Sequence, residues 1–291
     1  MPLVPASGVR GPIGSPASPA AADALRAFVA RHRRLFVLTG AGISTDSGIP
    51  CYRDAAGVWQ RSPPVLARDF IADHAVRQRY WARSMIGWPR IAAAHPNGGH
   101  AALARLEALG LTAAVVTQNV DGLHQRAGSV DPIELHGSLQ RVICLGCGQR
   151  AARSSLQQAF ERANPGFVTS CGAAALPDGD ASLTAVHCAG FCVPDCSACG
   201  GMLKPDVVFF GEGVPRERVA MARDGLATAD AMLVIGSSLM VYSGYRFCEW
   251  AVAGGKPIAI VNQGRTRADH LADLKIDGAC TAILGALADG A

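Results

Sequence analysis

The chain has 291 residues, of which 49% are hydrophobic and 17% charged, a balance typical of a folded globular protein. Its net charge of +4 argues against a specific nucleic-acid or membrane-surface binder. No apolar run approaches the ~18 residues that cross a bilayer, and the chain does not start with a secretory signal pattern. We therefore expect a soluble, cytoplasmic protein, with its oligomeric state left open.

The first residues, 1–20, are rich in Pro, Ala, Gly and Ser, which predicts a disordered tail. Beyond them, apolar runs alternate with stretches of helical periodicity. The predicted strands are Leu35–Thr39, Ala113–Thr117, Met232–Ile235 and Pro257–Val261. The predicted helices are Ala21–Arg34, Ala75–Ile86, His100–Leu109, Arg216–Ala229 and Tyr245–Ala253. This alternation predicts an α/β fold with a doubly wound, mostly parallel, Rossmann-like sheet.

The alternating pattern breaks between about residues 141 and 201, where cysteines, Pro and Gly gather. Two CxxC pairs, Cys144 with Cys147 and Cys196 with Cys199, predict a closed, structural Zn²⁺ site, because four thiolates leave no position for a catalytic water. Cys192 with Cys196 is an alternative pair of weaker spacing. We predict a Rossmann-like domain of residues 21–140 and 202–291, with residues 141–201 inserted as a small zinc-binding module.

Small and polar residues follow each predicted strand. These loops are Gly40-Ala41-Gly42-Ile43-Ser44, Gln118-Asn119-Val120-Asp121, Gly236-Ser237-Ser238 and Asn262-Gln263-Gly264. Ligands bind at the carboxyl ends of strands in open α/β sheets, so the four loops should line one crevice. The glycines after the first strand suit backbone N–H groups that approach a pyrophosphate, although a tight turn explains them equally well. No acidic residue ends a second strand about 20 residues on, which disfavours a hydride-transferring dehydrogenase.

With these motifs the sequence resembles the sirtuin (Sir2) family. The matching segments, in family order, are 40–44, 48–50 with Tyr52-Arg53, 117–121, His136-Gly137, the two CxxC pairs, 204–212 and 236–238. Within the family, segments 77–83, 87–89 and 241–247 resemble the class II branch that includes the mitochondrial lipoamidase and ADP-ribosyltransferase type. The resemblance implies an NAD-dependent protein-lysine deacylase that consumes NAD and acts on acyl-lysine proteins.

The resemblance also implies roles for single residues. Asn119 and Asp121 would hold the nicotinamide ribose and carboxamide, and His136 would be the general base; the plainer interpretations are an Asx turn and a structural histidine. The implied NAD-binding residues are Gly40, Ala41, Gly42, Ile43, Ser44, Ile49, Pro50, Tyr52, Arg53, Gln118, Asn119, Val120, Asp121, Gly236, Ser237, Ser238, Asn262, Gln263, Gly264 and Cys280. The implied substrate-binding residues are Val207, Val208, Phe209, Phe210 and Gly211, by strand addition, unless that run is a buried core strand.

In the implied reaction, nicotinamide leaves as the acyl-lysine oxygen attacks the ribose. His136 then activates the ribose hydroxyl that captures the acyl group, giving O-acyl-ADP-ribose. A mono-ADP-ribosyltransferase that shares the NAD site is the alternative enzyme. A zinc-knuckle binding module is the alternative of another class, disfavoured because no basic stripe with stacking aromatics is present.

Two features set this chain apart from the usual family pattern. Cys51 stands where the family usually has Asp, so the positioning or exchange of nicotinamide is expected to differ. Tyr80 and Arg83 lie three apart on one face of a predicted helix and resemble a pair that recognises acidic acyl groups. The sequence leaves open whether they reach the acyl pocket.

Overall fold

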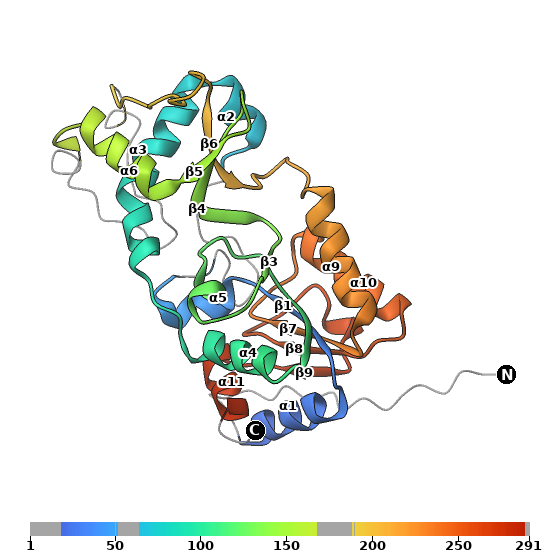
Figure 1. Ribbon diagram of the computed structural model, residues 1–291. Coiled ribbons are helices and arrows are strands. Elements are labelled where there is room, and N and C mark those ends of the chain that lie inside the picture. The colour runs from blue at the N-terminus through green and yellow to red at the C-terminus, as the bar shows by residue number, and fades with distance from the viewer. Residues whose placement is uncertain (1–18, 50, 52–63, 168–187, 189, 289–291) are drawn as a thin grey trace.

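The computed structural model describes residues 19–49, 51, 64–167, 188 and 190–288 (Figure 1). Most of the predicted N-terminal tail, and the implied NAD contacts Pro50, Tyr52 and Arg53, lie outside the described residues. Among the described helices, none is both long and apolar enough to cross a membrane.

A six-stranded parallel sheet forms the larger part of the molecule, with strand order β3-β2-β1-β7-β8-β9. Its strands are β1 Leu35–Thr39, β2 Thr112–Thr117, β3 Ile133–Glu134, β7 Ala231–Ile235, β8 Ile258–Val261 and β9 Leu274–Ile276. The strands β1, β7 and β8 are buried along their whole length, as expected for parallel strands covered on both faces. The predicted fold class is confirmed, and the four predicted strands are correct to within one residue at each end.

Helices cover both faces of this sheet. The first face carries α1 Pro19–Arg31, α4 Gly98–Ala108 and α11 Cys280–Ala288, and the second carries α9 Arg216–Thr228 and α10 Tyr242–Ala253. Figure 1 shows the first set gathered at the bottom of the view and α9 with α10 at the right. Short elements at the strand ends are η1 Ala41–Ser47, α5 Leu123–Arg126 and η2 Asp269–Leu271. The sheet therefore separates two apolar cores, one on each face.

The first helix ends earlier than its sequence predicts. It stops at Arg31 instead of Arg34, because the N–H groups of Arg33 and Arg34 donate to the carboxylate of Asp230, at 3.1 and 3.0 Å. A carboxylate from a distant segment thus outweighs the local preference for three more helical residues.

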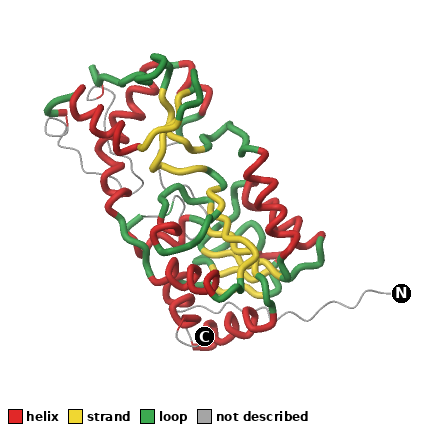
Figure 2. The backbone as a smooth tube through the Cα atoms, in the orientation of Figure 1, coloured by secondary structure: helices red, strands yellow, loops and turns green. Residues whose placement is uncertain are grey.

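A smaller lobe holds a three-stranded antiparallel sheet with the order β5-β4-β6. Its elements are α2 Ala67–Ala72, α3 His74–Ala93, β4 Gly137–Cys144, β5 Arg150–Ala152, α6 Arg153–Ala163 and β6 Leu203–Val207. Figure 2 shows the strands falling into an upper and a lower group, which are the two sheets. The lobe's apolar core includes Phe70 and Trp81 from α2 and α3 beside Phe160 from α6. Helices that the sequence places in the larger domain therefore pack with the inserted segment.

The helix α3 continues to Ala93, well past the predicted end at Ile86, although Pro89 lies inside it. A proline has no N–H to donate to the carbonyl four residues before it, here that of Met85. The side chain of Gln157 on α6 donates to this carbonyl instead, at 3.0 Å. A tertiary hydrogen bond thus compensates the one that Pro89 removes.

Candidate functional site

The loops after β1 and β7 pack backbone against backbone. Gly40 N–H donates to the Ile235 carbonyl at 3.0 Å, and Gly42 N–H donates to the Gly236 carbonyl at 2.8 Å. A Cβ atom on Gly42 would lie 2.7 Å from Gly236 Cα, and Gly236 itself has a φ of +61°. These glycines are therefore required for close packing of the two loops. The N–H groups of Gly40 and Gly42 are thus used in this packing, and the approach of the loop to a pyrophosphate stays a prediction.

The loop after β2 joins the same cluster through side chains. Gln118 Nε2 donates to Ser237 Oγ at 2.7 Å, and Asn119 Nδ2 donates to the Gly40 carbonyl at 3.1 Å and to Ser44 Oγ at 3.1 Å. Three of the four predicted crevice loops are thus hydrogen-bonded to one another. This arrangement fixes the three carboxyl ends of β1, β2 and β7 as one surface.

The fourth loop lies beside them, at the end of β8. Gly236 N–H donates to the Val261 carbonyl at 2.8 Å, which joins the third and fourth loops through the sheet. The Asn262 amide turns back to the carbonyl of Gln263 at 2.8 Å. The buried Cys280 thiol lies 3.7 Å from the Val261 carbonyl. These residues thus extend the same edge of the sheet.

Buried polar groups lie directly beneath the three interlocked loops. Asp121 is only 5% exposed and accepts from Ser44 Oγ at 2.8 Å and from Leu123 N–H at 3.0 Å. Burial raises the pKa of the Asp121 carboxyl, and the hydrogen bonds from Leu123 and Ser44 oppose that rise. Asp121 therefore faces inward and orients Ser44, which in turn contacts Asn119.

Two buried histidines that the sequence analysis did not single out complete this network. His100 Nε2 lies 3.5 Å from Ser44 Oγ, and His124 Nε2 lies 2.9 Å from Thr39 Oγ1. Their rings meet edge to face, 5.0 Å between centroids. Burial lowers the pKa of His100 to about 4 and that of His124 to about 3, so both are neutral at pH 7. Neither residue is part of a sequence pattern that distinguishes it from a core histidine.

His136 stands at the entrance to the cluster, directly before β4. Its Nδ1 lies 3.0 Å from the Gln118 carbonyl, and its Nε2 lies 2.7 Å from Ser243 Oγ. A carbonyl only accepts, so Nδ1 carries the proton and Nε2 presents its lone pair. Burial lowers the pKa of His136, the hydrogen bond to Gln118 raises it, and the charges of Arg218 and Arg246 lower it further. The imidazole is thus a neutral base with a defined tautomer.

Ser243 is a site residue that the sequence analysis missed. It lies in the first turn of α10, and its neighbour Gly244 packs so closely that a Cβ there would lie 2.6 Å from Gln118 Oε1. The segment 241–247 was noted only for its resemblance to one family branch. Its contact with His136 comes from the packing of α10 against the loop after β2.

The predicted substrate segment is only partly a strand. Val207 ends β6, and Val208 N–H donates to the His136 carbonyl at 2.8 Å, so the segment continues beside the candidate base. Phe209 is buried, whereas Phe210 is 42% exposed and its carbonyl accepts from Ala67 N–H at 3.0 Å. The segment is therefore a core strand up to Val207 and more open beyond it, up to the exposed Gly211.

Four sulfur atoms, from Cys144, Cys147, Cys196 and Cys199, all lie within 4.8 Å of one another. The Sγ atoms of Cys144 and Cys199 are 3.5 Å apart, and those of Cys147 and Cys196 are 3.9 Å apart. A tetrahedral Zn²⁺ with Zn–S bonds of about 2.3 Å needs separations of roughly 3.8 Å, so the four thiols fit this ion. Cys192, the alternative ligand, lies outside the cluster.

The remaining implied NAD contacts lie along the same loops. Ala41 and Ile43 are in η1, and Ile49 N–H donates to the Ser44 carbonyl. The Val120 carbonyl accepts from Leu139 N–H, and the Ser238 carbonyl accepts from Arg267 N–H. Gly264 N–H donates to Asp277. All described members of the predicted set thus belong to segments at the carboxyl edge of the parallel sheet.

Comparison with known proteins identifies the family to which this arrangement belongs. The profile of the Sir2 family matches residues 40–243, from the first glycine loop to Ser243. This chain belongs to the Sir2 family. The matched range includes His136, three of the crevice loops and all four cysteines. It therefore covers most of the parts that the sequence and the geometry bring together.

Curated bacterial relatives of this Sir2-family chain align over nearly its whole length. A protein of Xanthomonas campestris pv. campestris (strain 8004), named NAD-dependent protein deacetylase, is 57% identical over 91% of this chain and 90% of its own. A protein of Bradyrhizobium diazoefficiens, named NAD-dependent protein deacetylase 2, is 55% identical over 93% of this chain and 98% of its own. One of Bordetella bronchiseptica, named NAD-dependent protein deacetylase, is 52% identical over 90% and 95%.

Solved Sir2 structures have the same architecture. One described as "Structural Basis for the Mechanism and Regulation of Sir2 Enzymes" matches with a TM-score of 0.74 and 31% identity over 94% of this chain and 98% of its own. Another, described as "Sir2 bound to acetylated peptide", matches with a TM-score of 0.73 and 31% identity over 90% and 94%. The Sir2 fold of this chain thus has solved counterparts along most of its length.

Proposed function

We propose that this chain is an NAD-dependent deacylase that removes acyl groups from lysine side chains of proteins. One observation supports this function best. His136, which is neutral and has a defined tautomer, contacts both the interlocked loops, through the Gln118 carbonyl, and the segment after β6, through Val208 N–H. The names of the curated relatives, at 52–57% identity, agree with it. The products are the free lysine, nicotinamide and O-acyl-ADP-ribose.

In this proposal the interlocked loops hold NAD as the co-substrate. Asn119 presents its amide beside Ser44, and it meets the nicotinamide ribose from there. The buried Asp121 acts indirectly, because its carboxylate orients the hydroxyl of Ser44, which contacts Asn119. His136 Nε2 takes the proton of the ribose hydroxyl that captures the acyl group. Ser243, whose Oγ lies 2.7 Å from Nε2, yields that position to the ribose hydroxyl.

The zinc ion has no part in the chemistry that we propose. Four cysteines would hold Zn²⁺ in a closed site, and the ion would supply folding energy to the small lobe. Backbone N–H groups of Gly146 and Cys147 lie 3.3 and 3.5 Å from Cys144 Sγ, which suits a thiolate ligand. We also propose residues 141–201 as the inserted module, and a cytoplasmic location for the enzyme.

The extended acyl-lysine peptide binds, in our proposal, along residues 207–211. The Phe209 ring lies 5.3 Å from the Tyr80 ring and 5.2 Å from the Phe70 ring, so Tyr80 stands directly behind this segment. This position makes Tyr80 a candidate wall of the acyl pocket, whereas the finer assignment to the class II branch rests on the resemblance of segments 77–83, 87–89 and 241–247. We expect Tyr80→Phe to change the ranking of acyl groups more than it changes activity on acetyl-lysine.

The test incubates the protein with NAD and acetyl-, lipoyl-, biotinyl-, succinyl- or methylglutaryl-lysine peptides, followed by mass spectrometry. We expect nicotinamide and O-acyl-ADP-ribose in equal amounts, with one acyl group preferred. His74→Ala serves as a control histidine on the N-terminal turn of α3 and retains activity. ADP-ribose found on a protein instead of on the acyl group would replace this proposal with a mono-ADP-ribosyltransferase, and no NAD consumption with any peptide would refute both.

A further inference from the structure

The parallel sheet has an open edge along the first four residues of β2. The edge strand β3 has only two residues, which pair with Val116 and Thr117 of β2. The preceding residues of β2, Thr112–Val115, pair with β1 on one side and with no described strand on the other. Their outward backbone groups can therefore take a further strand, as open sheet edges do.

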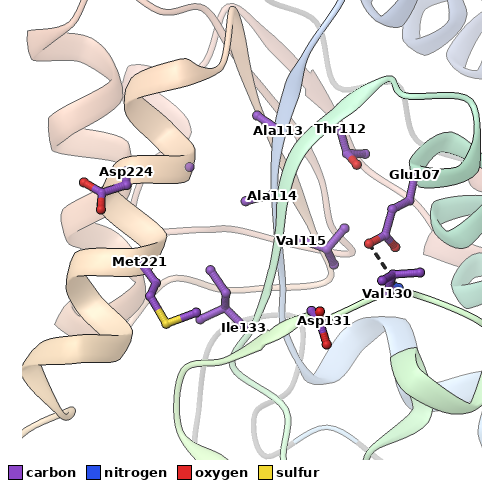
Figure 3. Close-up of a pocket in the computed structure, with 11 residues that line it drawn as sticks. Glu107, Thr112, Ala113, Ala114, Val115, Val130, Asp131, Ile133, Met221 and Asp224 are labelled. Carbon is purple, nitrogen blue, oxygen red and sulfur yellow. Dashed lines mark hydrogen bonds between the residues drawn. The ribbon is translucent and has the colours of Figure 1, made fainter.

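A hollow of about 490 Å³ lies along this open edge. The helix α9 bounds it on one face of the sheet and Glu107 of α4 bounds it on the other, as Figure 3 shows for Met221, Asp224 and Glu107. At one end of the hollow α9 packs closely on β2, since a Cβ on Gly225 would lie 2.5 Å from Ala114 Cβ. At about 3.3 Å a residue, four residues of an added strand match Thr112–Val115 in length.

The rim of the hollow combines exposed apolar side chains with acidic ones. Val130 is 72% exposed and Met221 58% exposed. Within the described residues, no lysine or arginine forms an ion pair with Glu107, Asp131 or Asp224. Glu107 Oε1 accepts from Val130 N–H at 3.1 Å, but its buried Oε2 has no partner in the described part of the chain. Three carboxylates beside an open strand edge favour a cationic occupant.

We propose that this hollow, which we call the β2-edge hollow, binds an extended segment of a partner protein that carries arginine or lysine. The segment adds to β2 at Thr112–Val115 through backbone hydrogen bonds. Side chains of a strand alternate between the two faces, so basic residues reach Glu107 on one face and Asp224 on the other. Apolar residues of the segment cover Met221 and Val130.

The test uses a fluorescein-labelled peptide of three Arg-Val repeats, which contains no lysine and is therefore neither substrate nor product of the proposed deacylase. Fluorescence anisotropy measures its affinity for the whole chain and for the double variant Glu107→Gln with Asp224→Asn. Loss of two partly exposed charge pairs should weaken binding at least about fivefold. The variant Glu217→Gln, on the same helix but away from the hollow, should leave the affinity within about twofold, and all variants should retain deacylase activity.

Hydrogen exchange of the wild-type chain gives a second measurement that needs no variant. Saturating peptide should slow exchange of the amides of Ala113 and Val115, because the added strand covers the edge. The proposal is overturned if the peptide does not saturate below about 1 mM, if a Glu-Val repeat binds equally well, or if protection occurs elsewhere. A dimer of the free chain in sedimentation, with Ala113 and Val115 amides protected before peptide is added, would also overturn it, in favour of a second copy as the occupant.

Discussion

At the scale of single residues, two hydrogen bonds orient His136 to act as a base. The Gln118 carbonyl fixes the proton on Nδ1, and the lone pair of Nε2 faces Ser243. Burial lowers the pKa of the ring below its ordinary value of 6.5. The neutral, proton-accepting form therefore exists above this lowered pKa and is lost as the pH falls through it.

The first prediction is a pH profile. We expect kcat/KM on an acyl-lysine peptide to stay level from pH 8 down to about 6.5 and to fall below that, because only the neutral imidazole accepts a proton. Steady-state rates measured from pH 5 to 8 check this. An acid limb centred at or above about pH 7 would show that His136 is not the group whose protonation limits the reaction.

The second prediction concerns the buried pair His100 and His124. Their pKa values, about 4 and about 3 in the folded chain, lie below the unfolded value near 6.5. The unfolded chain therefore binds more protons as the pH falls, so their stabilisation is complete above about 6.5 and declines towards the folded pKa values. We expect a loss of about 1–2 kcal/mol per histidine between pH 7 and 5.

Chemical denaturation at several pH values measures this loss. The variant His124→Gln removes one of the two titrating groups, so its stability should depend less steeply on pH than that of the wild type. An equal slope for both proteins would mean that other groups cause the pH dependence.

The sequence predicted site residues where a motif carries the chemistry, and it failed where tertiary packing does. His136, Asn119 and the glycine loops stand in recognisable order along the chain. Ser243 reaches the site only because α10 packs against the loop after β2. No local pattern separates His100 or His124 from ordinary core histidines. Asp121 stays a predicted ligand contact, and only the structure shows that its buried carboxylate accepts from Ser44.

At the scale of elements, the loops after β1 and β7 act as one unit. Gly42 lies so close to Gly236 that any side chain would separate them. We predict that Gly42→Ala destabilises the fold by about 1–3 kcal/mol, as overpacking does. It should also weaken NAD binding at least about tenfold, because the strand ends no longer meet.

Thermal unfolding and isothermal titration with NAD measure these effects. Gly213→Ala is the matched control, because a Cβ there meets nothing within 4 Å. If Gly42→Ala bound NAD as well as the Gly213 variant does, the close packing of the loops would not be needed for the site.

The zinc module gives a second prediction at this scale. Cys199→Ser should reduce the bound zinc, measured by mass spectrometry of the metal, from about one ion per chain to none and should destabilise the small lobe. Cys192→Ser, a change at an exposed cysteine outside the cluster, should keep the ion. Zinc loss in Cys192→Ser, with the ion kept in Cys199→Ser, would instead support the alternative pair of Cys192 with Cys196.

Element prediction from the sequence was accurate for the long apolar strands and poor for the short ones. The strands β3 and β9 have two and three residues and carry too little pattern to be predicted. The helix α3 was ended too early at the Gly-Trp-Pro segment. The sequence could not reveal that Gln157, far along the chain, satisfies the Met85 carbonyl that Pro89 leaves without its usual donor.

At the scale of the whole molecule, the candidate base lies where the two lobes meet. His136 follows β3 of the large sheet and precedes β4 of the small one. Asp206 of β6 pairs with Arg141 and Arg150 at 3.3 and 3.1 Å, and with Arg218 of α9 at 3.8 Å. The carboxylate of Asp206 in the small lobe therefore links this lobe to Arg218 of the larger domain. The sequence predicted the helix α3 but placed it in the larger domain, whereas its Trp81 packs with Phe160 of α6 in the small lobe.

The most direct test of the central claim compares the wild-type chain with His136→Ala in the presence of NAD and an acetyl-lysine peptide. Mass spectrometry follows O-acetyl-ADP-ribose, the product whose formation requires the base. We expect the wild type to form it together with nicotinamide, and the variant to form it about 10²–10⁴ times more slowly. An undiminished yield in His136→Ala would contradict the role of this histidine, and with it the account of the site.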